Sequence, residues 1–285
     1  MRQTIMDMRT TIAGLRTNAT DQAAALAVAV SATSTSTVLC DGFTIGHDNE
    51  LELLAPHLRG CTTMRGDLNV QGGGVSNVTA LAEAFTNLQL VSSSISITST
   101  SLSTLDGVFA ALVTLGGGLM ISRNHGLATL DRVFPSLTTV GPGSALQIHE
   151  NNGLGTFGDS FQALVTAPRV SILFNPNLVT LGGSFSALET VGNDLQFVGN
   201  TLLTTIGSSF GGMRSVGNLR WKFNGYTEDV TTSNAASRSF CASAVAALCP
   251  TTTLHDHGSG IGWGQNCPDS ARDCCSAYCA TNPDC

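Results

Sequence analysis

The sequence predicts a mainly β fold, a right-handed parallel β-solenoid that carries an N-terminal helix and a small disulfide-rich C-terminal tail. Two observations lead to this prediction. A short template, Leu-x-Ile followed by asparagine and then by spaced leucines, recurs through the middle of the 285-residue chain. A period of 20 to 50 residues is the signature of coils that stack on one another. Phenylalanine returns within the template every 24 to 27 residues, at Phe85, Phe109, Phe134, Phe161, Phe185 and Phe210.

Composition agrees with many short strands and excludes several other classes of protein. Only 12% of the residues are charged, while the glycines number 31, which is typical of strands joined by tight turns rather than of helical bundles. The net charge is −7 and the only lysine is Lys222, so we expect no basic stripe and no nucleic-acid partner. The longest apolar stretch, residues 23–30, is far shorter than the roughly 20 residues that a membrane-spanning helix needs.

Residues 1–39 are predicted to form a helix followed by a Ser/Thr-rich linker. Apolar residues recur every seven positions, at Ile5, Ile12, Ala19 and Leu26. This spacing is that of a coiled coil and makes the segment a candidate for homo-oligomerisation, although a lone amphipathic helix explains it as well. The first 21 residues lack the apolar run of a signal peptide, so either the natural start lies elsewhere or the chain is not secreted.

Residues 40–250 are predicted to form one capped solenoid with its coils over residues 66–230. Cys40 and Cys61 flank the stretch from Asp48 to Leu58, whose first turn is acidic. This stretch predicts a short amphipathic helix that caps the N-terminal end. Residues 231–250 are expected to close the other end with a helix, because an uncapped terminal coil exposes its apolar face.

Within each coil, the Leu-x-Ile element predicts a short strand whose two apolar side chains point to one face. Stacked coils then build a parallel sheet over a continuous aliphatic core. Glycines ahead of the strands, such as Gly141 and Gly217, are expected to supply the positive φ of a tight corner. An asparagine three residues after each strand is expected to join a buried ladder that satisfies the turn backbone. The members of this ladder are Asn124, Asn151, Asn175, Asn200 and Asn224.

The cap and the first coil resemble a known family. The string Cys40-Asp-Gly-Phe-Thr-Ile, the helical stretch, and then Gly60-Cys-Thr-Thr-Met-Arg-Gly-Asp-Leu-Asn-Val70 look like the opening of a receptor L-domain. That domain is the leucine-rich-repeat-like module of insulin and epidermal growth factor receptors, and repeats in fungal GPI-anchored wall proteins are similar. The resemblance covers about residues 40–230. It implies the solenoid fold, a Cys40–Cys61 disulfide and an extracellular or cell-surface location.

Residues 251–285 are predicted to form a separate cysteine-rich tail. Five of the nine cysteines lie between Cys267 and Cys285, a density typical of disulfide-bonded modules in an oxidising compartment. We expect a second disulfide between Cys241 and Cys249. Glycosylation is expected at the two sequons of the chain, Asn18 and Asn77.

Motifs that suggest catalysis or metal binding have simpler structural explanations. The stretch from Gly207 to Gly211 matches the Gly-x-Ser-x-Gly pattern of a nucleophile elbow. Phe210 within it is the repeat phenylalanine, so we assign the serine to a surface turn. His255 and His257 have the spacing of metal ligands, but a solvated polar loop is the preferred interpretation. We therefore expect no metal and no cofactor.

Catalysis by the sheet itself is also not expected. His149 and Glu150 form the one polar pair on the sheet that could do acid–base work, and ordinary surface exposure is the preferred interpretation. Only ten acidic and six basic residues occur between residues 66 and 230, and they are scattered. We expect that the protein is not an enzyme.

The outward strand positions are the preferred binding surface. A first row is expected to hold Asn69, Ser96, Met120, Gln147, Ser171, Gln196 and Arg220. A second row beside it is expected to hold Gln71, Thr98, Ser122, His149, Leu173, Val198 and Lys222. These small polar and aliphatic side chains suit broad, neutral recognition of a protein or glycan ligand. An inert scaffold face is the alternative interpretation.

Two functional classes follow from this organisation. The preferred one is a non-enzymatic secreted or cell-surface recognition module that binds through the sheet. The rival is a structural component of an extracellular wall, sheath or filament, assembled through the N-terminal helix and the cysteine-rich tail. A threonine array such as an ice-binding surface is not expected, because the Thr-Ser-Thr-Ser run after Ile97 does not recur in the other coils.

Overall fold

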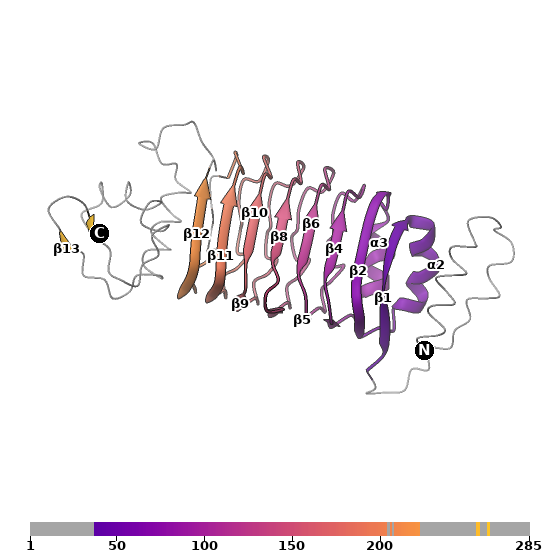
Figure 1. Cartoon of the computed structure of the whole chain (residues 1–285). Helices are drawn as coiled ribbons and strands as arrows, with labels where there is room; N and C mark the ends of the chain where they lie inside the picture. Colours follow the sequence, from indigo (N-terminus) through magenta and orange to yellow (C-terminus); the bar gives the residue numbers. More distant parts are fainter. Residues whose placement is uncertain (1–36, 204–205, 207, 223–254, 257–260, 263–285) are drawn as a thin grey trace.

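The structure, a computed structural model, describes residues 37–203, 206, 208–222, 255–256 and 261–262. Its main body is an elongated parallel β-solenoid in which successive coils stand side by side from β1 to β12 (Figure 1). The prediction of a mainly β, parallel fold is confirmed. The expected N-terminal helix, the closing helix in residues 231–250 and the Cys241–Cys249 disulfide lie outside the described residues. Of the tail, only the antiparallel pair β13 (His255–Asp256) and β14 (Ile261–Gly262) is described.

Each middle coil contributes two strands, and each kind of strand stacks into its own parallel ladder. The short-strand ladder consists of β3 (Leu90–Val91), β5 (Thr114–Leu115), β7 (Thr139–Val140) and β9 (Thr166–Ala167). The long-strand ladder consists of β4 (Ile95–Thr98), β6 (Leu119–Ser122), β8 (Leu146–His149) and β10 (Val170–Leu173).

Longer strands join the two ladders at both ends of the solenoid. β2 (Thr63–Gly74) pairs with β3 and with β4, and β11 (Thr190–Val198) pairs with β9 and with β10. β1 (Leu39–His47) pairs with β2, and β12 (Ser215–Lys222) pairs with β11. β1 to β12 therefore form one 12-stranded sheet in which every pairing is parallel.

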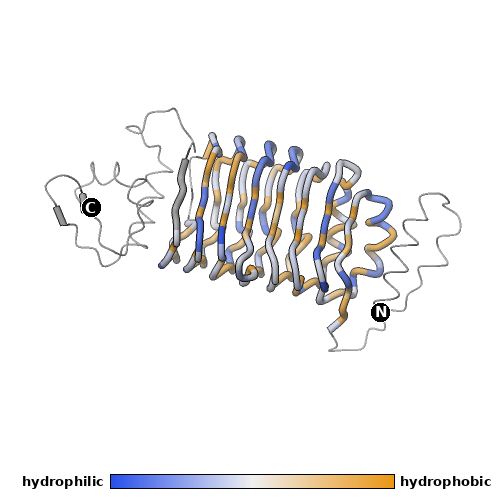
Figure 2. Tube along the Cα trace, viewed as in Figure 1, coloured by the Kyte–Doolittle hydropathy of each residue, from blue (hydrophilic) through white to orange (hydrophobic). Residues whose placement is uncertain are grey.

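Alternation along each long strand places its apolar side chains in the core. Ile95 and Ile97 of β4 are fully buried, and so are Leu146 and Ile148 of β8. The residues between them lie on the outside and are half-exposed. Polar and apolar segments consequently alternate along the coils (Figure 2).

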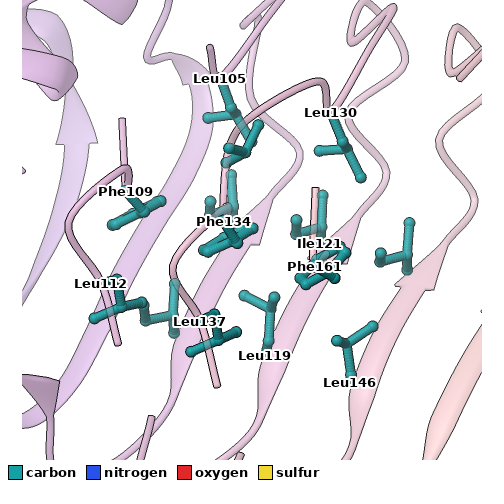
Figure 3. Packing of buried hydrophobic residues seen from close by; sticks show 14 of the residues in the cluster. Leu105, Phe109, Leu112, Leu119, Ile121, Leu130, Phe134, Leu137, Leu146 and Phe161 are labelled. Atoms are coloured by element: carbon teal, nitrogen blue, oxygen red, sulfur yellow. The ribbon is translucent and has the colours of Figure 1, made fainter. Parts of the chain in front are cut away.

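The recurrent phenylalanines form one stacked column, as their period predicts. All six side chains are buried, and the centroids of successive rings lie 5.2–5.4 Å apart. Figure 3 shows Phe109, Phe134 and Phe161 in succession among the leucines of neighbouring coils. Phe43 of β1 extends the column, with its ring centroid 6.3 Å from that of Phe85. The column runs through a single hydrophobic core.

The asparagine ladder is confirmed at Asn124, Asn151, Asn175 and Asn200, which are all fully buried. The backbone N–H of one asparagine donates to Oδ1 of the asparagine in the next coil at 3.1 Å. Each Nδ2 donates to a strand carbonyl of the preceding coil at 2.9–3.0 Å. Thr100 begins the ladder by donating its N–H and its hydroxyl to Asn124. Asn224 lies outside the described residues.

The glycines ahead of the strands serve a different purpose from the expected one. Gly141 and Gly217 do not adopt a positive φ. A Cβ on Gly141 would lie 1.8 Å from the carbonyl oxygen of Gly116, and a Cβ on Gly217 would lie 2.4 Å from that of Asn193. Glycine is required because backbone packs on backbone at these bends. Positive φ occurs instead at the corner before each ladder residue, at Ser99, Arg123, Glu150, Phe174 and Gly199.

Two helices cover the β1–β2 end of the solenoid (Figure 1). α2 (Asp48–Leu58) is the predicted amphipathic helix, and it buries Leu51, Ala55 and Leu58. α3 (Val78–Phe85) was not predicted, because it occupies the place where later coils have only a turn. The N-terminal cap therefore consists of two helices rather than one.

The Cys40–Cys61 disulfide is confirmed and ties β1 to the chain just before β2. We expect the double change Cys40→Ala and Cys61→Ala to lower the free energy of unfolding by about 3 kcal/mol, because the 21-residue separation then adds loop entropy to the unfolded chain. Urea unfolding of the two proteins measures the difference. Equal unfolding free energies would show that the cap does not depend on this bond.

Two carboxylates near the N-terminal end predict a loss of stability in acid. Hydrogen bonds from the Ser93 hydroxyl and the Ser94 N–H hold the pKa of Asp67 below its ordinary value of 3.8. Burial raises the pKa of Asp48, but hydrogen bonds from Ser76 and Asn77 outweigh it and lower that pKa. A lowered pKa gives stability that is present above the unfolded-state pKa and is lost as the pH falls through the folded-state pKa.

We therefore expect the melting temperature of the wild type to fall between about pH 5 and pH 2 more steeply than that of Asp67→Asn. The exposed Asp106 provides the control, since Asp106→Asn removes the same charge from another exposed position. Calorimetry of the three proteins across this range measures the slopes. Parallel curves for the wild type and Asp67→Asn would contradict the assignment.

Candidate binding surface

The outward positions of the long-strand ladder align in two rows, as the sequence predicts. The first row is in register from Asn69 through Ser96, Met120, Gln147, Ser171 and Gln196 to Arg220. The second is in register from Gln71 through Thr98, Ser122, His149, Leu173 and Val198 to Lys222. Adjacent strands lie about 4.8 Å apart, so each row brings consecutive side chains into contact range.

Exposure within the rows is uneven, and one expected contact residue is buried. Ser171 has only 3% of its surface exposed, because it is short and lies in register between Gln147 and Gln196. It therefore cannot contact a ligand directly. Among the members of the first row whose side chains are described, Met120 is the most open at 37%. Asn69, Ser96, Gln147 and Gln196 are half-exposed.

Exposure is also uneven in the second row. Ser122 and Val198 are buried, whereas His149 and Leu173 are half-exposed. The side chains of Arg220 and Lys222 at the end of the rows are not among those that the structure describes. The described contact surface thus extends from β2 to β11 and is mostly uncharged.

An ion pair stands at the corner next to this surface. Nε of Arg123 lies 2.8 Å from Oε2 of Glu150, and Nδ1 of His149 lies 3.6 Å from Oε1 of the same carboxylate. The hydrogen bond from Arg123 holds the pKa of Glu150 below its ordinary value, and the same bond raises the pKa of Arg123. The pair keeps both charges fixed at the end of the strands, so His149 and Glu150 form part of a charged corner.

The serine of the Gly-x-Ser-x-Gly pattern lies in a turn with a structural role, but the expected surface position is wrong. Ser209 is buried, and its hydroxyl donates to the carbonyl oxygen of Gly182 in the preceding coil at 3.4 Å. Ser184 makes the equivalent bond to Gly158 at 3.0 Å. These serines stabilise the turn that leads into the phenylalanine column. Among the described residues, no three His, Cys, Asp or Glu side chains gather as a metal site would require.

The sequon at Asn77 lies at the start of α3. Oδ1 of Asn77 accepts the N–H of Ala80 at 3.0 Å and so caps the helix, while Nδ2 donates to Oε1 of Glu52 at 3.3 Å. Thr79, the third residue of the sequon, is exposed. Asn18 lies outside the described residues.

A third row of outward side chains was not predicted from the sequence. It lies on the outward face of the short-strand ladder and carries a hydroxyl in six of seven coils: Thr63, Leu90, Thr114, Thr139, Thr166, Thr190 and Ser215. The signal was present in the sequence as a Thr or Ser directly before the apolar residue that precedes each bend. The Thr-Ser-Thr-Ser run after Ile97, by contrast, begins on the long-strand ladder.

Together these features define the class: a parallel β-solenoid with a stacked phenylalanine column, an asparagine ladder and one mostly neutral outward face. Comparison with protein-family models, with curated proteins and with solved structures finds no match. None of the helices in the described part of the chain is long and apolar enough to cross a membrane.

Proposed function

We propose that this chain is a non-enzymatic recognition module, secreted or displayed at a cell surface, that binds a protein or glycan ligand through the outward face of the long-strand ladder. The observation that supports this most strongly is the register of the two outward rows across seven coils. Such a face offers an extended surface of repeated contacts, which is how solenoids commonly bind their ligands.

The proposal includes a right-handed winding and membership of the receptor L-domain type of leucine-rich-repeat-like modules. The disulfide-tied cap, the buried asparagines and the parallel ladders support this type. An extracellular or cell-surface location, with a glycan on Asn77, is part of the same proposal. The Cys40–Cys61 bond supports an oxidising compartment.

A comparison of two triple variants tests the binding face. The first carries Met120→Glu, Gln147→Glu and Gln196→Glu on the long-strand ladder. The control carries Thr114→Glu, Thr139→Glu and Thr166→Glu on the short-strand ladder, which adds the same charge. We expect the full chain to bind members of a glycan array or an array of extracellular protein domains, the first variant to lose this binding and the control to retain it. Loss in the control alone would move the binding face to the short-strand ladder.

The alternative proposal is a structural component of an extracellular wall, sheath or filament. It is supported by the position of β1, which is a terminal strand of the sheet among the described residues and begins at Leu39, close to residues 1–36. Light scattering after size-exclusion chromatography, on the full chain and on residues 40–285, distinguishes the two functions. Assembly of the full chain but not of the truncated chain would support the structural role, and two monomers would contradict it.

A further inference from the structure

The most exposed large apolar side chain in the described part of the protein is that of Phe174, at the corner where β10 ends. Phe174 is 54% exposed, and its φ of 54° is left-handed. The other coils place polar residues or glycine at this corner: Ser99, Arg123, Glu150 and Gly199. A bulky side chain in this conformation is uncommon. The other phenylalanines that adopt it, Phe161, Phe185 and Phe210, are buried in the column, whereas Phe174 is exposed.

The next coil leaves room for the ring of Phe174. A Cβ on Gly199 would lie 2.6 Å from Cδ1 and 3.0 Å from Cε1 of Phe174, so any larger residue would displace the ring. The backbone of Phe174 is fixed as well, because its N–H donates to the carbonyl oxygen of Val198 at 2.7 Å. The ring is therefore positioned against main chain on one side, while more than half of the residue surface stays open to solvent.

Polar groups occupy the equivalent corner of the preceding coil and the turn that follows. Glu150 occupies the same corner in the preceding coil, and its N–H donates to the carbonyl oxygen of Leu173 at 3.1 Å. Its carboxylate is oriented by Arg123 at 2.8 Å. On the turn that follows, Nδ2 of Asn177 donates to the carbonyl oxygen of Asn152 at 2.7 Å, and both asparagines are exposed. The open ring of Phe174 and the carboxylate of Glu150 thus stand at equivalent corners of adjacent coils, with exposed amide groups on the turn that follows.

We infer that this corner binds a neutral glycan, with the Phe174 ring packed against one sugar ring and Glu150 accepting hydrogen bonds from its hydroxyls. The inference rests on the proposed recognition function and names its ligand class. Sugars with the β-gluco configuration fit best, because their axial C–H groups form apolar faces that are attracted to the electron-rich face of an aromatic ring. Their equatorial hydroxyls donate at the rim, where charge-assisted bonds to a carboxylate are strong.

The ion pair favours a sugar over an apolar protein side chain at this corner. Val179, on the turn after Phe174, and Leu202, on the turn after Gly199 in the next coil, are also exposed, at 44% and 50%. These side chains would suit an apolar partner. Such a partner would take water from Arg123 and Glu150 without replacing its hydrogen bonds, which is costly. Sugar hydroxyls replace those bonds. Protein binding at this corner is therefore the competing outcome of the test.

The full chain is tested with cellohexaose, a β-1,4-linked glucose hexamer, by saturation-transfer NMR and titration. We expect magnetisation to pass from protein aromatic protons to the axial sugar protons. Phe174→Ala should weaken binding by roughly tenfold, the effect of losing one aromatic contact, and Phe174→Tyr should retain it. Glu150→Gln should weaken binding to a smaller extent. Val165→Ala, which trims an exposed side chain on the flank of the short-strand ladder, is the matched control.

The outcomes separate this inference from the proposed function. If Phe174→Ala binds cellohexaose like the wild type, or if cellohexaose does not bind, the corner site for glycans is wrong. Recognition itself still stands in either case if the Met120, Gln147 and Gln196 triple variant loses binding on the arrays. If Phe174→Ala instead abolishes capture of an arrayed protein domain, the corner is a protein-binding site and the glycan inference is overturned.

Discussion

Replacing Asn151 with alanine is expected to lower the free energy of unfolding by about 4 kcal/mol. Oδ1 of Asn151 accepts the backbone N–H of Asn124 at 3.1 Å, and its Nδ2 donates to the carbonyl oxygen of Ile121 at 3.0 Å. Alanine leaves both of these buried main-chain groups without their bond, at a cost of about 1–3 kcal/mol for each. Urea unfolding followed by far-ultraviolet circular dichroism measures the loss.

The neighbouring residue provides a matched control. Asn152 is exposed, and Asn152→Ala should change the unfolding free energy by no more than about 0.5 kcal/mol. The change Asn151→Asp separates shape from hydrogen bonding, because aspartate has the same size and cannot donate to Ile121 when ionised. At neutral pH, Asn151→Asp should lower the free energy of unfolding as much as Asn151→Ala does. If Asn151→Ala and Asn152→Ala unfold alike, the ladder does not stabilise the solenoid.

The asparagine ladder and the phenylalanine column could be predicted because they depend only on the period of the sequence repeat. A residue that returns once per coil must meet its equivalents when the coils stack, whatever the local backbone does between them. Phe157 shows the limit of this reasoning. It takes the place that leucine holds at Leu130 and Leu181, yet it is buried and packs 6.5 Å from Phe161, ring centroid to ring centroid. The core accepts that exchange without a change in the column.

The short-strand ladder could not be predicted in the same way, because its strands are too short to show an alternation of polar and apolar residues. Two residues, as in Thr114–Leu115, give a single alternation, and many loops contain the same pair. The left-handed corner was missed for another reason: Ser99, Arg123, Glu150 and Phe174 share a φ but no side-chain chemistry. Their common feature is their position directly before the ladder residue, and the left-handed φ at that position is seen only in the folded backbone.

Exposure on the binding surface depends on neighbours in other coils rather than on local sequence. Ser171 points outward at the expected register, and the glutamines on both sides exclude solvent from it. Phe174 is open because Gly199 in the next coil has no side chain to cover it. Both effects join residues that are 24 to 25 positions apart, so they become visible only once the coils are aligned.

Replacing Phe185 with alanine is expected to cost about 3–5 kcal/mol of unfolding free energy, through the cavity that the ring leaves. Its ring is fully buried, and its centroid lies 5.2 Å from that of Phe161 and 5.4 Å from that of Phe210. The change also interrupts the column in its middle, where each coil is stabilised mainly by its two neighbours. Thermal unfolding by calorimetry, supported by urea titration, measures the effect.

Phe174 supplies the control that isolates burial from residue type and backbone conformation. Its φ of 54° is close to the 63° of Phe185, so both changes put alanine into the same left-handed region and remove the same ring. Phe174 is more than half exposed, and Phe174→Ala should therefore change the unfolding free energy by no more than about 0.5 kcal/mol. A large loss for Phe185→Ala beside a negligible one for Phe174→Ala would show that the buried ring in the column stabilises the solenoid. Equal losses would mean that the left-handed backbone shared by the two positions, rather than ring stacking, determines the effect.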